Sequence, residues 1–351
     1  MNAQESTSIS GDKEHFYDMI STVRKKLDCL PADSFIKKYF PLSRLNEVQK
    51  KIEKSSASEL EWAYWQPLFL FLCRQSSVAL NALDEDLRKV VKHRHNKMSE
   101  EKVCEFLRDR SDFTGDRPWW AGLFEIYVKS TLIGCEQLTV ESLDWVLPNG
   151  RNMDVRIGIG ARKFGVECTV FGESDANKQV WHQHHAEKPS QALVQSLDPY
   201  SHGRRLYQRV YGKLAPNLDL SKSQLSQDSP NLLLIGLSAG MSDLSSDAPS
   251  IGWALNELFS DQPNGKNSPV SLQEYLVREK RNYPERGFPG GDLEDLLHAP
   301  SQISGIMLFD GCELKHARIN YNARECCRLS HDEMAFFERT LSRNPRYVNN
   351  W

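Results

Sequence analysis

The chain has 351 residues, enough for two or three domains or for one core domain with an added region. Its 40% hydrophobic and 26% charged residues are typical of a globular protein and argue against a disordered or membrane-embedded chain. The net charge of −3 excludes a global basic field, so any nucleic acid must be bound by local basic patches.

Targeting and membrane signals point to the cytoplasm. The longest apolar run, around residues 62–73, contains Gln66 and Pro67 and is too short to span a bilayer, so no membrane partner is expected. The N-terminus has neither a basic n-region nor an apolar h-region, so no secretory signal is expected. The eight cysteines are scattered without a CxxC pair, which favours reduced thiols over a disulfide framework. We therefore expect a cytoplasmic protein.

Residues 1–110 are predicted to form an all-helical N-terminal region. Apolar residues recur there at helical spacing, for example in the stripe Phe16, Ile20, Val23 and Leu27. The region ends in a dense cationic run, RKVVKHRHNK, over residues 88–97. Such a run is usually a solvated helix face. The sharper interpretation is a patch that contacts phosphate through Lys92 and Arg94.

Residues 111–351 are predicted to form an α/β domain with C-terminal additions. The elements follow one another as helix, strand, strand, strand, helix and strand, which implies a mixed sheet flanked by helices. In chain order we expect an apolar helix, an alternating strand, a hairpin, a basic helix and a buried strand over residues 119–133, 138–147, 152–171, 202–214 and 231–238. Further helices are expected near 252–259, 272–281, 293–298 and 333–341, and another buried strand over 303–310.

The hairpin at 152–171 carries two acids that strand alternation places on one face. Its apolar residues occupy alternate positions in both strands, which leaves Asp154 and Glu167 on the opposite face. With the turn centred between Ala161 and Arg162, position 154 lies opposite position 169. The two acids are then diagonal neighbours, about 7–8 Å apart at their backbones. Two carboxylates that close can hold a divalent cation between them.

A third acid, Glu125, lies on the apolar helix just before these strands. Carboxylate oxygens are the ligands that Mg²⁺ prefers, and a water bound to such an ion can become a nucleophile. Each acid also has a plainer interpretation. Asp154 and Glu167 would lie on the solvent side of a half-exposed hairpin, and Glu125 on the solvent stripe of its helix.

The order of elements and these residues together resemble the restriction-endonuclease-like, PD-(D/E)XK, nuclease superfamily. The matching residues are Glu125 on the first helix, Met153–Asp154 on the second strand and Glu167–Cys168–Thr169 on the third. The similarity covers roughly residues 117–239, and the N-terminal helical region has no counterpart in it. It implies phosphodiester cleavage with Mg²⁺, or Mn²⁺, held by Asp154 and Glu167, with Glu125 assisting directly or through water.

Thr169 stands where the family pattern has a lysine that positions or activates the attacking water. A threonine hydroxyl carries no charge and cannot stabilise a developing phosphorane as an ammonium does. Lysines move to neighbouring elements in this fold, and the candidates are Lys213, Lys178 and Lys163, in that order. Met153 also stands where the family often has proline, at a loosely specified position.

The basic helix over 202–214 carries Arg204, Arg205 and Arg209 in addition to Lys213. These arginines form either a solvated face or a grip on the phosphates of a bound strand. The leading hypothesis is therefore a Mg²⁺-dependent nuclease, impaired if no lysine replaces Thr169, with DNA favoured over RNA. The alternative is a catalytically inactive nuclease-fold module that binds nucleic acid or a protein. The N-terminal helical region would recognise the substrate, a protein partner or a second copy of the chain.

Overall fold

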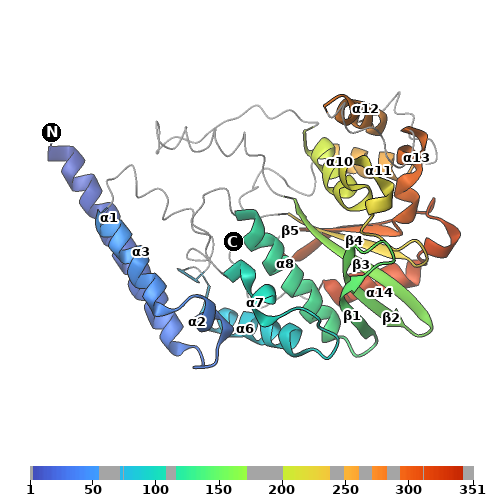
Figure 1. Cartoon of the computed structure of the whole chain (residues 1–351). Coiled ribbons are helices and arrows are strands. Elements are labelled where there is room, and N and C mark those ends of the chain that lie inside the picture. Colours follow the sequence, from blue (N-terminus) through green and yellow to red (C-terminus); the bar gives the residue numbers. More distant parts are fainter. Residues whose placement is uncertain are drawn as a thin grey trace.

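A six-stranded mixed sheet, in the order β1-β2-β3-β4-β5-β6, lies at the centre of the computed structural model (Figure 1). The structure describes residues 3–54, 72–73, 75–107, 116–171, 201–237, 249–260, 271–282, 293–310 and 312–342. The strands are β1 Thr139–Val146, β2 Asn152–Ile159, β3 Arg162–Phe171, β4 Asn231–Leu237, β5 Gly305–Asp310 and β6 Glu313–Ile319. The first three pair antiparallel, β4 is parallel to both β3 and β5, and β6 returns antiparallel to β5.

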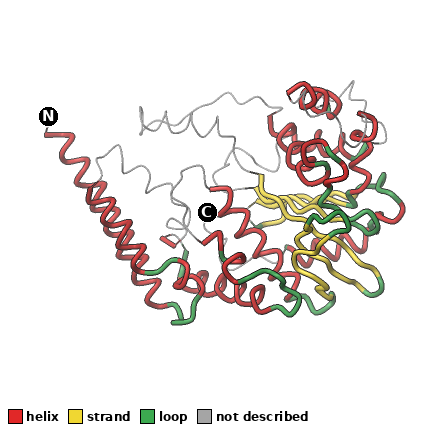
Figure 2. Tube along the Cα trace, viewed as in Figure 1, coloured by secondary structure: helices red, strands yellow, loops and turns green. Residues whose placement is uncertain are grey.

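Helices cover both faces of this sheet (Figure 2). In β4, Leu232 and Leu234 join the core that contains α8, whereas Leu233 and Ile235 join the core that contains α10. This alternation is what a strand buried on both faces requires. The α-helices are α1 Ala3–Cys29, α2 Phe35–Tyr39, α3 Leu42–Lys54, α6 Ser77–Lys92, α7 Glu100–Val103, α8 Asp116–Ile133, α10 Ser201–Leu214, α11 Pro249–Leu258, α12 Leu272–Asn282, α13 Leu293–His298 and α14 His331–Leu341. Short 3-10 helices lie at Glu105–Leu107, Pro216–Leu218, Leu220–Lys222, Ala299–Gln302 and Glu325–Cys327.

The N-terminal helices share a continuous core with α8 and the sheet. Buried residues of α1 and α6, such as Phe16 and Leu87, belong to the same cluster as Tyr127 of α8. The segment after α6 also reaches the sheet edge, where the Leu143 amide donates to the His95 carbonyl at 3.2 Å. The described helices of the predicted N-terminal region are therefore packed onto the α/β part of the chain.

The predicted mixed sheet flanked by helices is confirmed, and the strands and helices expected from residue 119 onward lie within a few residues of their predicted positions. Residues 55–71, where much of an expected helix falls, lie outside the described residues, as does Lys178.

No helix in the described ranges combines the length and the apolar character needed to cross a membrane.

The register of the β2–β3 hairpin differs from the predicted one. Ile159 pairs with Arg162 and Val155 with Val166, so the turn consists of Gly160 and Ala161. Gly160 has φ +58°, the left-handed region that glycine enters without strain. The turn therefore lies one residue earlier than expected, and the pairing shifts by two residues. A shift of two preserves the strand faces but brings position 154 opposite 167.

Two glycines give a matched test of how α8 and α10 pack. A Cβ on Gly236 of β4 would lie 2.9 Å from the ring of Phe124, whereas one on Gly212 of α10 would have no heavy atom within 4 Å. We predict that Gly236→Ala lowers the free energy of unfolding by about 1–3 kcal/mol through overpacking. Gly212→Ala should raise it by roughly 0.5–1 kcal/mol through helix propensity. Urea unfolding measures both, and equal effects would contradict the packing of α8 on β4.

Candidate functional site

The candidate site lies where β2 and β3 stop pairing with each other. Their ladder ends at Val155 and Val166, and the next residues outward are Asp154 and Glu167. Here carboxylates replace backbone carbonyls as hydrogen-bond acceptors. The Asp154 amide donates to Glu167 Oε2 at 3.1 Å, and the Cys168 amide donates to Asp154 Oδ2 at 2.6 Å. The two acids are thus held face to face by the backbone of each other's strand.

The side-chain alternation of both neighbouring strands is interrupted at this level. On β2, Val155 packs in the α8 core, but Met153, two residues earlier, packs in the α10 core. On β1, Leu143 packs in the α8 core, and the following residue, Asp144, has φ +52°. The register of β1 and β2 sets Asp144 across from Asp154. Residues directly opposite each other on antiparallel strands share a face, so this register brings the two acids together at the level where the alternation is interrupted.

Three acids gather toward α8. Glu125, Asp144 and Asp154 each offer an oxygen, and the three oxygens lie within 4.8 Å of one another. Lys129, fully buried one turn after Glu125, places its Nζ 2.5 Å from Glu125 Oε1 and 3.5 Å from Asp144 Oδ1. Asp144 Oδ2 is buried and has no hydrogen-bond partner within the described ranges. An unsatisfied buried carboxylate oxygen is costly, and a bound cation would satisfy it.

A second lysine approaches from the opposite face of the sheet. Lys213, in the last turn of α10, lies with its Nζ 2.5 Å from Glu167 Oε1. Of the two candidate replacements for Thr169 that lie within the described residues, Lys213 is the one beside the acids. Lys163 instead pairs with Glu141 at 3.1 Å, at the turn end of the hairpin. Thr169 itself is half-buried on β3, opposite Ile235 of β4.

Burial and mutual repulsion raise the pKa values of the two central acids. Burial, followed by the charge of Glu125, raises the pKa of Asp154 to about 6. Burial, followed by the charge of Asp154, raises the pKa of Glu167 to about 8. Burial opposes the charged forms of Lys213 and Lys129, but the surrounding carboxylates outweigh it and raise both pKa values. Both lysines are therefore ammonium ions at neutral pH.

Glu125, Asp144 and Asp154 offer oxygens that could meet at one hard divalent cation. Glu167 lies beside them, with its Oε1 next to Lys213 and its Oε2 accepting from the Asp154 amide. Four carboxylates, those of Glu125, Asp144, Asp154 and Glu167, are balanced by two ammoniums, so the fully ionised cluster has two negative charges in excess. A single Mg²⁺ or Mn²⁺ would neutralise that excess, and oxygen ligands are the kind these ions prefer. Glu125 is 33% exposed, so the cluster can be reached from solvent.

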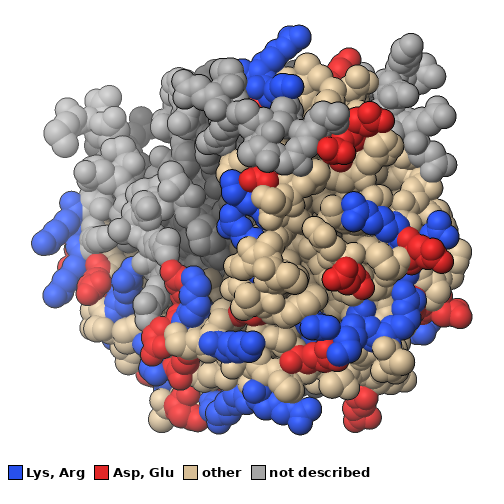
Figure 3. Space-filling model, turned by 45° about the vertical axis from the view of Figure 1, so that its right-hand side comes forward, with Lys and Arg blue, Asp and Glu red and all other residues tan. Residues whose placement is uncertain are grey.

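The predicted phosphate-contacting residues lie on two sides of the cluster. Arg205 and Arg209 are half-buried and precede Lys213 by two turns and one turn of α10, so the three share one helix face. Arg204 is exposed beside them. Lys92 and Arg94 are exposed at the end of α6, next to the His95 carbonyl that meets β1. On the face seen in Figure 3, basic and acidic side chains are interspersed.

Two members of the cluster, Asp144 and Lys129, are absent from the residues singled out in the sequence. A signal for Asp144 did exist. A turn centred on Asn149, the middle of Pro-Asn-Gly, places position 144 opposite position 154. Lys129 follows Glu125 at the i,i+4 spacing of an ordinary surface ion pair, and only its complete burial sets it apart.

The raised pKa of Glu167 makes stability depend on pH. Its folded-state pKa of about 8 lies above its ordinary value of 4.5. The protonated carboxyl therefore contributes stability that is complete below pH 4.5 and is lost as the pH rises through 8. We predict that the unfolding free energy of metal-free protein receives a falling contribution from pH 5 to 8, and that Glu167→Gln flattens this fall. Urea titrations across that range measure it, and identical profiles would contradict the shift.

Lys129 should be worth far more to stability than an exposed lysine. Lys129→Met leaves Glu125 and Asp144 without their buried counter-charge, which should cost about 3–5 kcal/mol at pH 8. Saturating Mg²⁺ should restore part of this loss if the cluster binds the ion. The control is Lys89→Met, which breaks an ion pair to Asp86 whose lysine is 50% exposed and should change stability by less than about 1 kcal/mol. Equal costs would contradict the buried arrangement.

The cluster thus combines a binding capacity for one divalent cation with two fixed ammoniums and adjacent arginines. Comparison with protein-family models, curated proteins and solved structures finds no match to this chain.

Proposed function

We propose that this protein is a divalent-cation-dependent nuclease of the PD-(D/E)XK kind, acting on DNA in preference to RNA. The observation that carries the proposal is the cluster of four acids and two ammoniums, which has two excess negative charges when all four acids are ionised, together with the unsatisfied Asp144 Oδ2. Such a site suits a metal ion that acts on a phosphodiester.

The arrangement of the surrounding elements supports this choice. The acids come from α8, β1, β2 and β3, and the ammonium of Lys213 comes from α10, the crossover that leads into the parallel strand β4. The elements follow the order helix, three antiparallel strands, helix and parallel strand. This is the order in which the sequence resembles the nuclease superfamily. Fold likeness supports a reaction class only together with the chemistry of the site.

In this proposal Asp154 and Glu167 hold the cation, with Asp144 as a third oxygen donor and Glu125 acting directly or through water. A bound Mg²⁺ or Mn²⁺ would polarise the scissile phosphate and lower the pKa of a water. Glu167 Oε2 is already oriented by the Asp154 amide, and Asp154 Oδ2 by the Cys168 amide. These hydrogen bonds hold the carboxylates in place before a substrate arrives, which reduces the cost of reorganisation.

Lys213 takes the role of the lysine that Thr169 replaces. Because the carboxylates raise its pKa, it remains an ammonium and cannot act as a general base near neutral pH. We assign to it the stabilisation of negative charge that develops on the phosphate. Arg209 and Arg205, on the same face of α10, would contact neighbouring phosphates of the strand.

An inactive module that binds nucleic acid or a protein is the second candidate, and one observation favours it. Lys213 and Lys129 each lie 2.5 Å from a carboxylate, so both ammoniums are already engaged within the cluster. A relic that had lost its metal would need such internal counter-charges to keep four acids together.

Nuclease assays decide between the two. Wild-type protein is expected to cleave supercoiled plasmid, single-stranded DNA or RNA in the presence of Mg²⁺ or Mn²⁺, and to lose activity with a chelator. Asp154→Asn, Glu167→Gln and Lys213→Met should each lower the rate by at least about 100-fold. Glu136→Gln, at an exposed acid in the turn before β1, is the control and should be unchanged.

Calorimetric titration with Mn²⁺ separates the roles. Lys213→Met should retain metal binding while losing cleavage, whereas Asp154→Asn and Asp144→Asn should lose binding. If wild type and Glu167→Gln are equally inert on every substrate, and Mn²⁺ binding does not depend on Asp154, the nuclease proposal is wrong and the inactive module stands.

A further inference from the structure

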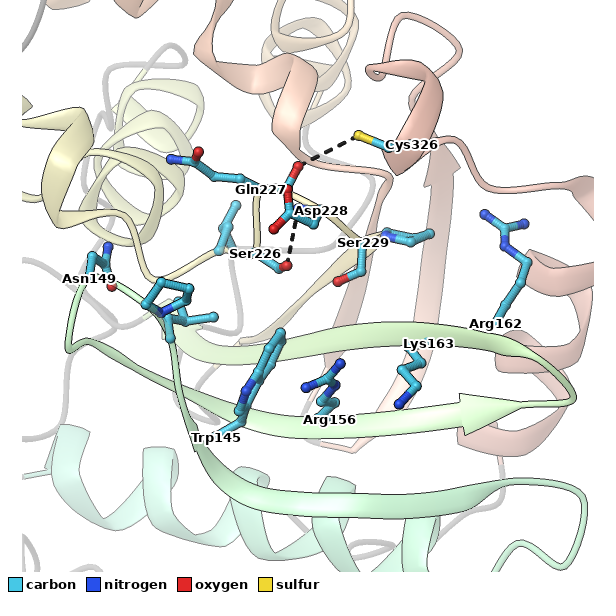
Figure 4. A pocket seen from close by; sticks show the side chains of 14 residues that line it. Trp145, Asn149, Arg156, Arg162, Lys163, Ser226, Gln227, Asp228, Ser229 and Cys326 are labelled. Carbon is cyan, nitrogen blue, oxygen red and sulfur yellow. Dashed lines mark hydrogen bonds between the residues drawn. The ribbon is translucent and has the colours of Figure 1, made fainter.

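A separate pocket of about 580 Å³ opens between the β1–β3 strands and the loop at 225–230 (Figure 4). Its volume falls in the range of roughly 300–1,000 Å³ that small-molecule sites occupy. One wall is made by strand side chains that include Trp145, Arg156 and Lys163. The other is made by the loop before β4, with Cys326 at its rim.

The guanidinium of Arg156 contacts two neighbours inside this pocket. Its guanidinium lies over the Trp145 ring, 4.2 Å from the ring centroid, and its Nε lies 3.2 Å from Glu141 Oε2. These two contacts leave the terminal nitrogens directed into the pocket (Figure 4). Nε, although close to Glu141, makes no hydrogen bond within the described ranges. A planar guanidinium fork stacked on a ring in this way matches the oxygens of a phosphate group.

Two further polar groups lie around this fork. Lys163 lies on β3 and shares the carboxylate of Glu141 with Arg156. These three residues together carry one positive charge in excess. Across the pocket, the Ser229 hydroxyl oxygen is buried and has no hydrogen-bond partner in the part of the chain described. Figure 4 shows it pointing from the loop toward the strands. A buried hydroxyl without a partner facing a cavity is a group that a ligand can satisfy.

The remainder of the lining suits a ring that carries polar substituents. Leu147, Pro148, Leu225 and Pro230 supply apolar surface. Asp228 on the loop adds a carboxylate that can accept hydrogen bonds from an amino or hydroxyl group. An anionic group, a flat apolar body and hydrogen-bond donors occur together in a nucleotide.

The pocket is distinct from the candidate metal cluster. Arg156 pairs with Gly165, and the side chain of Met153 packs over Gly165. None of the cluster's four acids or two lysines lines the pocket. Binding there goes beyond the proposed nuclease activity and does not require it.

We propose that this pocket binds a nucleotide unit, with the phosphate on the Arg156 fork and Lys163, the ring against the apolar wall, and Ser229 donating or accepting one hydrogen bond. The unit is either a free mononucleotide or one residue of a nucleic-acid strand, because both present the same groups.

Calorimetric titration with adenosine 5′-monophosphate tests the proposal, with inorganic phosphate, adenosine and a short single-stranded oligonucleotide as parallel probes. The monophosphate or the oligonucleotide should bind more tightly than phosphate or adenosine alone. Arg156→Ala should weaken binding about tenfold or more, and Arg156→Lys should fail to restore it because a lysine lacks the fork. Ser229→Ala should weaken binding by a few-fold, about the worth of one hydrogen bond.

Lys315→Ala on β6, at the other edge of the sheet, is the matched charge control and should bind like wild type. Glu141→Gln removes the carboxylate that Arg156 and Lys163 share and should not weaken binding of the monophosphate. Titration of the monophosphate without divalent cation keeps this test separate from the nuclease proposal. Circular dichroism of each variant checks its fold. Binding of the oligonucleotide but not the monophosphate, lost in Arg156→Ala, would assign the pocket to a strand. The proposal is overturned if neither nucleotide probe binds, if folded Arg156→Ala binds as wild type does, or if phosphate alone binds as tightly as the monophosphate.

Discussion

The structure depends on how four carboxylates are kept together in a largely buried place. Repulsion among Glu125, Asp144, Asp154 and Glu167 would expel them from a core, and the fold offsets it with two ammoniums and two backbone amides. The amides are available because β2 and β3 stop pairing with each other at this level. The ammoniums are available because α8 and α10 each carry a lysine that reaches the acids. The cluster can therefore exist only where the strands stop pairing and both helices bring a lysine to the acids.

This constraint links the two faces of the sheet. Lys129 reaches the acids from α8, inside the core that also holds the N-terminal helices, and Lys213 reaches them from α10. The N-terminal region also supports the cluster, because the His95 carbonyl accepts a hydrogen bond from the Leu143 amide, next to Asp144. A change in the packing of either helix should alter the charge balance of the cluster, which is why stability, proton uptake and metal binding are expected to vary together.

The pocket at Arg156 places a second set of polar groups on the same hairpins. In the pocket, Arg156 and Lys163 share the single carboxylate of Glu141, which leaves one positive charge in excess. The pocket therefore favours an anion, whereas the acid cluster favours a cation. A nuclease-fold protein with a neighbouring nucleotide pocket would combine cleavage with recognition of one unit of the strand. An inactive relative would retain recognition alone.

The sequence by itself determined the mixed sheet, the flanking helices and the acids of the hairpin, because strand and helix periodicities are local properties of the chain. It also singled out Lys213, whose Nζ lies 2.5 Å from Glu167 Oε1 in the structure. Only the tertiary structure decided that Asp154 faces Glu167 directly, since a turn one residue earlier changes every pair. It likewise revealed Asp144 and Lys129, whose roles arise from a left-handed strand residue and from complete burial. The left-handed conformation of Asp144 and the burial of Lys129 cannot be predicted from residue spacing, because both depend on what packs against those positions.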